Sequence, residues 1–360
     1  MQTDDYRGIL LGNCPLLDVR APVEFAKGAF PGAVNLPLMD DRERQRVGTA
    51  YNRDGHDAAV ALGHELVSGA LREGRIDGWV AFCEAHPDGL LYCFRGGERS
   101  AIVQRWLAER GVEITRISGG YKAMRRWLID QTERLCDAMP ITLVGGRTGT
   151  GKTEVLVRLS DRIDLEGLAN HRGSGFGRRA TPQPPPIEFE NRLAIDWLRL
   201  EALETDRVVM EDESRCIGRC ALPEPLWDRF QEAPIALIEE DVAARVARIR
   251  REYTEAAVAE FEGVHPGEGF DRYAAHLLAS LDRIQRRLGG KAHAELRKLM
   301  GLALEAQRDS GDATGHDAWI ERLLRDYYDP MYDYQLERKR ERVVFRGSGD
   351  EVIDFIEGLS

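Results

Sequence analysis

The sequence predicts two successive α/β units, each built on a mostly parallel sheet, with a helical extension after the second. Three observations support this prediction. Short apolar runs alternate with helical stretches in the first part of the chain, the alternation restarts near 136–140, and a full G-x-x-x-x-G-K-[ST] motif follows the restart. We therefore place the first unit at 1–133 and the second at 139–345.

The first unit reads as strands alternating with helices. Short apolar runs that end in charge or turn residues predict strands at 14–20, 33–37, 89–92 and 112–117. Helical patterning covers 58–75. A second helix is expected over 101–110, with Ser100 as its N-cap and Gly111 at its end, and a third opens at Gly119 and contains Trp127.

The second unit begins with a buried-type strand at 141–144 and a helix at 154–159, with further strands at 208–210 and 235–238. The proline-rich stretch 181–186 is expected to be an extended loop. From 241 the chain becomes helical and rich in Arg and Glu until a last strand near 342–345. The aromatic cluster 327–334 is expected to end a helix at Pro330. Its rings favour packing, although stacking on an unpaired base is the alternative.

Composition restricts the class of protein. The 360 residues are 43% hydrophobic and 31% charged, as in a water-soluble globular chain. No signal peptide and no membrane-spanning run is recognisable, and the six cysteines are scattered, so we expect reduced thiols in the cytoplasm. Cys216 and Cys220 lack further ligands nearby, so no metal site is expected. A net charge of −11 means that an RNA partner would meet a local basic patch.

A candidate nucleophile follows the predicted strand at 89–92. Cys93 opens a glycine-rich turn that carries Arg95 and Arg99 and leads into a helix. Positive charge, backbone N–H groups and a helix N-terminus favour a thiolate and an approaching oxyanion. A buried structural cysteine beside a tight turn is the alternative, but two arginines and two glycines within so few residues favour a catalytic role.

The phosphate-binding motif lies between a strand and a helix, the context that it requires. Its glycines let the backbone wrap a phosphate, Lys152 reaches the terminal phosphates, and Thr153 binds a metal ion or a phosphate oxygen. The predicted diphosphate site comprises Gly146, Arg147, Thr148, Gly149, Thr150, Gly151, Lys152 and Thr153. No base-specificity motif accompanies it, so a polyphosphate ligand is better supported than hydrolysis of a nucleotide.

Three further groups are tentative. Glu211, Asp212 and Glu213 end a strand where an acid would hold Mg²⁺, or they are simply surface charges. The loop 171–179 closes over phosphates or RNA, or is a mobile solvated segment. Arg283, Arg286 and Arg287 share a helix face that suits a phosphate backbone, although a solvated face is the default.

The first unit resembles rhodanese domains. The resemblance covers about 5–130 and rests on Asp-Val-Arg at 18–20, Gly-Ala-Phe-Pro-Gly-Ala-Val-Asn-Leu-Pro at 28–37, the loop from Cys93 to Ser100, and Gly-Gly-Tyr at 119–121. It implies that Asp18 and Arg20 are structural and tie the end of the sheet to the loop.

The whole chain resembles the bacterial tRNA 2-selenouridine synthases, in which a rhodanese-like domain is fused to a P-loop domain. The resemblance rests on the Cys93 loop and the phosphate-binding loop, and on three further segments at 165–174, 211–215 and 327–330. It strengthens a functional role for a tentative second-domain set: His171, Arg172, Ser174, Glu211, Asp212, Ser214 and Arg215.

The resemblance implies conversion of wobble 2-thiouridine to 2-selenouridine in the tRNAs for Lys, Glu and Gln. Selenophosphate would be the donor, and geranyl diphosphate would first alkylate the sulfur. It implies no tightly bound cofactor, leaves Mg²⁺ open, and makes the selenophosphate-producing enzyme a candidate partner. Cys93 would either carry selenium or order selenophosphate. The alternatives are a rhodanese-type sulfurtransferase with an NTP-dependent tRNA-binding domain, and a non-catalytic redox or phosphate-sensing module.

Overall fold

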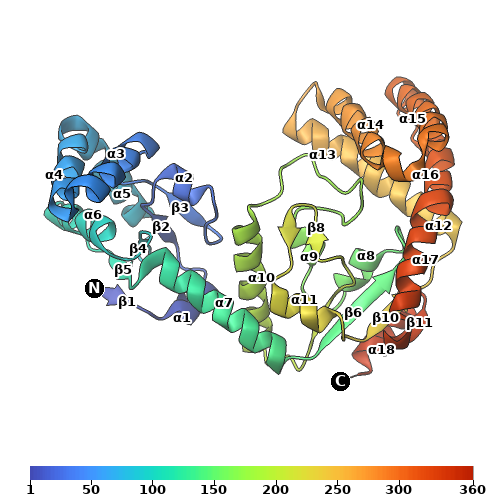
Figure 1. Ribbon diagram of the computed structural model, residues 1–360, viewed down its shortest axis with the longest axis horizontal. Helices are drawn as coiled ribbons and strands as arrows, with labels where there is room; N and C mark the ends of the chain where they lie inside the picture. Colours follow the sequence, from blue (N-terminus) through green and yellow to red (C-terminus); the bar gives the residue numbers. More distant parts are fainter. Residues whose placement is uncertain (360) are drawn as a thin grey trace. The chain divides into compact units, whose positions relative to one another are not determined.

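The computed structural model describes residues 1–359, which form two compact units (Figure 1). The first unit comprises 1–135 together with 185–199, and the second comprises 136–184 and the chain from 200 onward. Each unit has its own parallel sheet with helices packed around it, which confirms the predicted fold class.

The first unit is built on a five-stranded sheet in the order β1-β5-β4-β2-β3, in which every pairing is parallel. Because β2 and β4 are parallel neighbours, the segments that follow them leave the sheet at the same edge. This edge brings 18–20 and the Cys93 loop together. The strands are β1 (Gln2–Thr3), β2 (Leu16–Asp18), β3 (Ala33–Asn35), β4 (Leu90–Tyr92) and β5 (Thr115–Ile117).

The helices of the first unit differ from the prediction between 41 and 85, where three helices replace the single one expected over 58–75. The apolar periodicity continues across two breaks: Gly55 has φ +87 between α3 and α4, and Ser68 is extended before α5. The helices are α1 (Tyr6–Leu11), α2 (Pro22–Phe25), α3 (Asp41–Asp54), α4 (His56–Leu66), α5 (Gly69–Ala85), α6 (Glu98–Glu109) and α7 (Gly120–Ala138).

The core of the first unit lies between the sheet and helices α5 and α6. Trp79 of α5 and Trp106 of α6 stack with ring centroids 6.2 Å apart, and both pack in one buried cluster with Leu17 and Leu91 from the strands. The large apolar area that these side chains remove from water is the main stabilising term for this unit.

Helix α10 (Pro186–Ala202) lies largely in the first unit, although the sequence placed 139–345 in the second. Asn191 is fully buried and donates to the carbonyl oxygen of Ala29 at 3.0 Å, while Arg125 donates to Asn191 Oδ1 at 3.0 Å. A long-range contact of this kind leaves no trace in local sequence pattern.

The second unit contains a four-stranded parallel sheet in the order β11-β10-β6-β7. The second unit extends past its predicted end at 345, because α18 packs against β10, β11 and α8. A short hairpin, β8 (Cys216–Ile217) with β9 (Cys220–Ala221), follows β7. The other elements here are β6 (Ile141–Gly146), β7 (Val208–Glu211), β10 (Ile235–Ile238), β11 (Val343–Gly347), α8 (Lys152–Leu156), α9 (Leu165–Leu168), α11 (Glu224–Phe230) and α18 (Gly349–Glu357).

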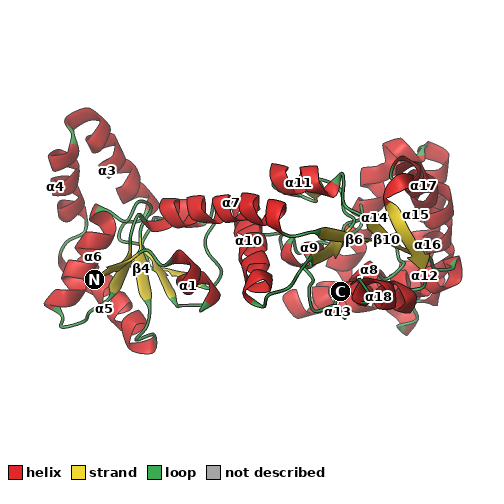
Figure 2. Ribbon diagram, turned by 90° about the horizontal axis from the view of Figure 1, so that it is seen from below, coloured by secondary structure: helices red, strands yellow, loops and turns green. Residues whose placement is uncertain are grey.

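The predicted helical extension packs on itself around a buried cluster that includes Phe176, Tyr273 and Trp319 (Figure 2). It contains two π-helical turns, η1 (Arg251–Glu255) and η3 (Leu324–Tyr328), a conformation that is frequent at functional sites. The helices are α12 (Val242–Arg250), α13 (Ala256–Val264), α14 (Gly269–Leu288), α15 (Gly290–Ser310), α16 (Asp317–Leu323) and α17 (Asp329–Arg338). The 3₁₀ turns are η2 (Thr314–His316) and η4 (Arg340–Arg342).

The sequence predicted that a helix ends at Pro330, and this prediction is wrong. Pro330 is the second residue of α17 and follows directly on the π-helical turn η3, so the helical chain continues through the proline. Across the described residues, no helix is both long enough and apolar enough to cross a bilayer.

Candidate functional site

The Cys93 thiol lies at the end of β4 and is only 2% exposed. Its Sγ donates to Ser100 Oγ at 3.3 Å, and Ser100 Oγ donates to the carbonyl oxygen of Gly97 at 3.1 Å. Helix α6 begins at Glu98, so Ser100 lies in its first turn instead of capping it as predicted. Because a hydroxyl can rotate, Ser100 can donate to Sγ once the thiol is ionised.

The backbone of the Cys93 loop is held by the glycine turn before α7. Tyr121 N donates to the carbonyl oxygen of Cys93, and Lys122 N donates to that of Phe94, both at 2.9 Å. Gly120 has φ +60, and a Cβ there would lie 2.3 Å from the carbonyl oxygen of Cys93. Only glycine permits this approach, so the two segments form one rigid unit.

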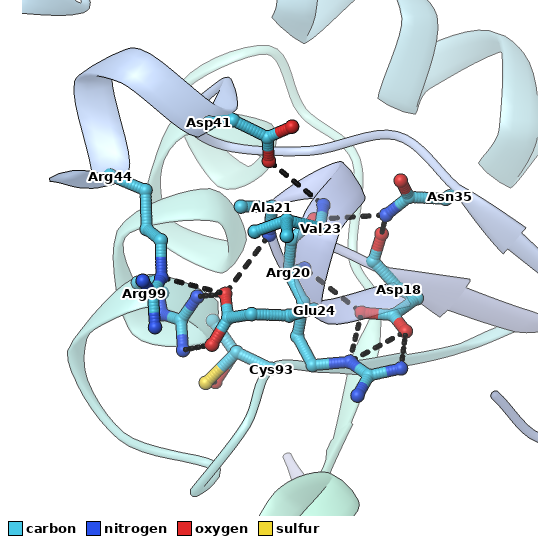
Figure 3. A network of polar contacts seen from close by, with 11 residues as sticks. Asp18, Arg20, Ala21, Val23, Glu24, Asn35, Asp41, Arg44, Cys93 and Arg99 are labelled. Atoms are coloured by element: carbon cyan, nitrogen blue, oxygen red, sulfur yellow. Dashed lines mark hydrogen bonds and ion pairs between the residues drawn. The ribbon is translucent and has the colours of Figure 1, made fainter. Parts of the chain in front are cut away.

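The two arginines of the loop occupy different environments. Arg99 donates to Glu24 Oε2 at 2.5 Å and to Oε1 at 3.2 Å, so its charge is largely compensated (Figure 3). Burial by itself would raise the pKa of Glu24, but the hydrogen bonds from Arg99 outweigh burial and lower it. Arg95 is exposed and has no side-chain partner among residues 1–359, so it is the better placed of the two to meet an oxyanion.

Asp18 and Arg20 form a buried pair behind the loop (Figure 3). Arg20 Nη2 donates to Asp18 Oδ2 at 2.7 Å and to the carbonyl oxygen of Gly28 at 3.0 Å. Its guanidinium also lies 3.8 Å from the centroid of the Tyr121 ring. The pair therefore joins the strand end, the segment before β3 and the glycine turn, which is the structural arrangement that the rhodanese resemblance implies.

The phosphate loop connects β6 to α8 with the geometry that anion binding needs. Gly149 and Gly151 have φ +84 and +83, which turn the chain so that α8 begins at Lys152. Helix α8 is short, and the loop residues 148–151 line the same cavity as Lys152. Lys152 Nζ donates to the carbonyl oxygen of Gly146 at 3.3 Å.

Thr150 supports the loop from within. Its hydroxyl donates to the carbonyl oxygen of Arg147 at 2.9 Å, and its N–H donates to the same oxygen at 3.2 Å. The side chain thus closes the loop from within, and Thr150 also lines the cavity described below.

Helices from the C-terminal part hold the phosphate loop from outside. Arg245 is fully buried and donates to the carbonyl oxygen of Thr148 at 2.9 Å and to Asp329 at 2.5 and 3.0 Å. Arg147 pairs with Asp333 at 2.5 Å. Gly146 N donates to the hydroxyl of Tyr332 at 2.7 Å. The loop conformation thus depends on α12 and α17.

A cavity of about 580 Å³ opens over the phosphate loop. The loop 171–179 forms part of its wall through Arg172, Ser174 and Arg179, so the structure brings this tentative segment to the phosphate loop. Ser174 Oγ lies 3.1 Å from the hydroxyl of Tyr253, which is in η1. Arg172 donates to Glu260 at 2.9 Å.

His171, the first residue of this loop, is buried but does not line the cavity. Burial, followed by the nearby charges of Arg178 and Arg283, lowers the pKa of His171 to about 4. The imidazole is therefore neutral at physiological pH. Its backbone N–H donates to the carbonyl oxygen of Glu166 at 3.0 Å, which ties the loop to α9.

The residues after β7 separate into different roles. Glu211 is fully buried, accepts from Leu165 N at 3.0 Å and does not line the cavity. Asp212 and Ser214 do line it, with Asp212 paired to Lys339 at 2.6 Å. Arg215 is exposed and lies outside the cavity lining. No group of three or more His, Cys, Asp or Glu side chains within residues 1–359 is arranged to hold a metal ion.

The predicted arginine face on α14 is divided. Arg287 lines the cavity, and Arg283 donates to the carbonyl oxygen of Gly175 at 3.1 Å at its edge. Arg286 is exposed and is not part of the lining. Two of the three cations are thus positioned beside the loop 171–179.

Glu213, one of the strand-end acids singled out from sequence, lines this cavity, but sequence reasoning missed other side chains of the lining: Glu166, Arg248, Tyr332 and Lys339. Burial, then repulsion from Glu213, raises the pKa of Glu166 to about 8. Burial would lower the pKa of Lys152, but Glu213 and Glu166 outweigh it and raise the pKa. Glu166 lies within a segment that carries the family resemblance, which is the signal that could have identified it.

Fold and sites together define a class: a rhodanese-like domain with a loop cysteine, joined in one chain to a P-loop domain. Residues 4–126 match the rhodanese-like domain family, and 139–359 match the family described as the tRNA 2-selenouridine synthase AAA domain. The chain belongs to the tRNA 2-selenouridine synthase family, which confirms the resemblance drawn from its motifs.

Proteins named tRNA 2-selenouridine synthase match this chain over nearly its full length. One from Pseudomonas fluorescens is 54% identical over 352 residues, covering 98% of this chain and 97% of its own. One from Bordetella bronchiseptica is 52% identical, covering 99% and 97%. One from Marinobacter nauticus is 50% identical, covering 98% and 96%.

Proposed function

We propose that this chain converts wobble 2-thiouridine to 2-selenouridine in the tRNAs for Lys, Glu and Gln, with selenophosphate as donor. An S-geranyl intermediate formed from geranyl diphosphate would connect the two steps. The observation that carries the proposal is the presence, in one chain, of a buried cysteine on a tight glycine loop and a phosphate loop ringed by cations. Full-length similarity to proteins named tRNA 2-selenouridine synthase supports it.

The first step uses the cavity over the phosphate loop. The thiocarbonyl sulfur attacks C1 of the geranyl group, the C1–O bond breaks, diphosphate leaves with the electron pair, and the N3 proton of the base is released. Lys152, Arg248 and Arg287 surround the space for the diphosphate. Their charges stabilise the leaving group as its own negative charge develops. Asp212, held by Lys339, and Ser214 line the same space.

The second step uses the Cys93 loop. Selenium attacks C2 of the alkylated base, the C2–S bond breaks, and geranylthiol departs, while the P–Se bond of the donor is cleaved by water to give phosphate. Cys93 orders selenophosphate together with Arg95, so selenium stays at the selenide level throughout the step. Alkylation makes the sulfur a better leaving group, which explains why one chain has both loops. The enzyme that makes selenophosphate is the candidate protein partner.

The test is reconstitution on an anticodon stem–loop containing 2-thiouridine, with nucleosides analysed by mass. Cys93→Ala should accumulate S-geranyl-2-thiouridine without selenation. Lys152→Ala should lose geranyl diphosphate affinity and fail at the first step. Selenation at the parent rate by Cys93→Ala, or unchanged diphosphate binding by Lys152→Ala, would overturn the assignments. Repeating the reaction with EDTA shows whether Mg²⁺ is required.

A further inference from the structure

A second large cavity, of about 990 Å³, lies entirely within the first unit and has Cys93 in its wall. This volume is at the upper end of the range for small-molecule sites. The cavity is larger than a cysteine loop needs to admit selenophosphate, a compact tetrahedral anion. The volume of the cavity that selenophosphate would leave unfilled can hold a larger ligand.

Part of the wall is the helical hairpin α3–α4 (Figure 2), whose two helices pack against each other. Apolar side chains from this hairpin and from α6 face the cavity: Val47, Tyr51, Ala59, Val60, Ile102 and Trp106. Tyr51 is 56% exposed, a high value for an aromatic side chain that lines a cavity. The lining is therefore apolar surface that remains available to a ligand.

Exposed cations line the cavity together with the carboxylates of Glu24 and Glu98. Lys27 and Arg95 are both exposed and lack a side-chain partner among residues 1–359. Arg44 also lines the cavity, and its Nε lies 3.7 Å from Glu24 Oε2. An apolar interior with free positive charges at its mouth is complementary to a polyanion that carries an apolar substituent.

We propose that this cavity, the α3–α4 chamber, binds the geranyl substituent of the S-alkylated wobble uridine, with an RNA phosphate at Lys27, while Arg95 meets selenophosphate at the Cys93 loop. The inference rests on the proposed function and locates its second substrate. The alkyl sulfur is bonded directly to the carbon that selenium attacks. A base that presents C2 to the Cys93 loop must therefore also place a ten-carbon chain beside Cys93, and the chamber is the space there.

A substrate prepared in advance tests this without the phosphate loop. Stem–loops carrying S-geranyl- or S-methyl-2-thiouridine are given with selenophosphate, and kcat/KM for selenation is compared. Each buried methylene contributes roughly fourfold to affinity, so we expect the parent chain to prefer the geranyl RNA at least tenfold. Val60→Asp should lose most of that preference through KM. Ala61→Asp, which adds the same charge at an exposed position of α4 outside the lining, should keep it.

Val60→Phe serves where the charged variant fails to fold. It keeps the wall apolar but shortens the chamber, so it should still accept an S-dimethylallyl RNA and discriminate against the geranyl one. Equal use of geranyl and methyl RNA by the parent chain would overturn the inference, and so would an unchanged preference in both Val60 variants, the result expected if a protein partner covers this face. Selenation of neither RNA would instead refute the proposed function.

Discussion

Replacing Arg245 by methionine tests whether the phosphate loop is shaped from outside. The buried guanidinium makes three hydrogen bonds, one to the loop carbonyl of Thr148 and two to Asp329. Removing one partner of a buried ion pair costs about 3–5 kcal/mol. Because Asp329 keeps 15% of its side chain exposed, water recovers part of this penalty, and we expect a loss of about 3 kcal/mol.

The assay is hydrogen-exchange mass spectrometry of the full chain, read on peptides that cover 141–156. A loss of about 3 kcal/mol corresponds to local opening on the order of 100-fold more frequent. Peptides from the first unit serve as an internal standard. Arg251→Met is the matched control, since Arg251 is 60% exposed and its pair with Glu154 should contribute under about 1 kcal/mol.

Affinity for geranyl diphosphate should fall with the same substitution, because the Thr148 carbonyl loses its donor and the loop is less well ordered. A double-mutant cycle with Asp329→Asn separates the pair from its surroundings. If Arg245→Met exchanged no faster than Arg251→Met over 141–156, or if the cycle were additive, the argument that α12 and α17 shape the loop would be refuted.

Two other predictions concern Gly120 and Glu166. Gly120→Ala places a Cβ 2.3 Å from the carbonyl oxygen of Cys93 at φ +60, so it should lower the free energy of unfolding by about 1–3 kcal/mol and abolish selenation while S-geranylation continues. The control is Gly78→Ala in α5, where a Cβ would meet nothing within 4 Å. Equal selenation by the two variants would contradict this prediction. The pKa of Glu166 is raised from its ordinary 4.5 to about 8, so the folded chain holds this proton more tightly than the unfolded chain, and stability declines as pH rises through that window. Glu166→Gln should lack this part of the decline in urea midpoints measured from about pH 5 to 8, and parallel curves for the two chains would count against the shift.

Contiguous features were predictable from sequence because their information is local. Apolar runs identified most strands, and strand, glycine loop and lysine are adjacent in the chain, so the phosphate loop needed no tertiary knowledge. Local pattern was misleading where tertiary context decides. Helical structure continues from the π-helical turn η3 through Pro330, and Ser100 bonds to the cysteine instead of capping a helix.

The side chains that sequence reasoning did not connect with the phosphate site lie far from the phosphate loop in the sequence. Tyr332 reaches Gly146, Arg245 reaches Thr148, and Lys339 reaches Asp212, each across roughly a hundred residues or more, and nothing in the separate segments signals these pairings. The raised pKa of Glu166 could not be predicted from sequence, because it depends on burial and on the nearby charge of Glu213.

Helix α10 makes the first unit discontinuous, and this constrains the order of folding. During synthesis 1–135 emerge first, but the contacts that Ala29 and Arg125 make with Asn191 cannot form until 185–199 have followed. The phosphate loop has already left the ribosome by then. The rhodanese-like half is thus completed only by a segment made after the diphosphate loop, so a chain truncated near 135 would lack part of its own fold.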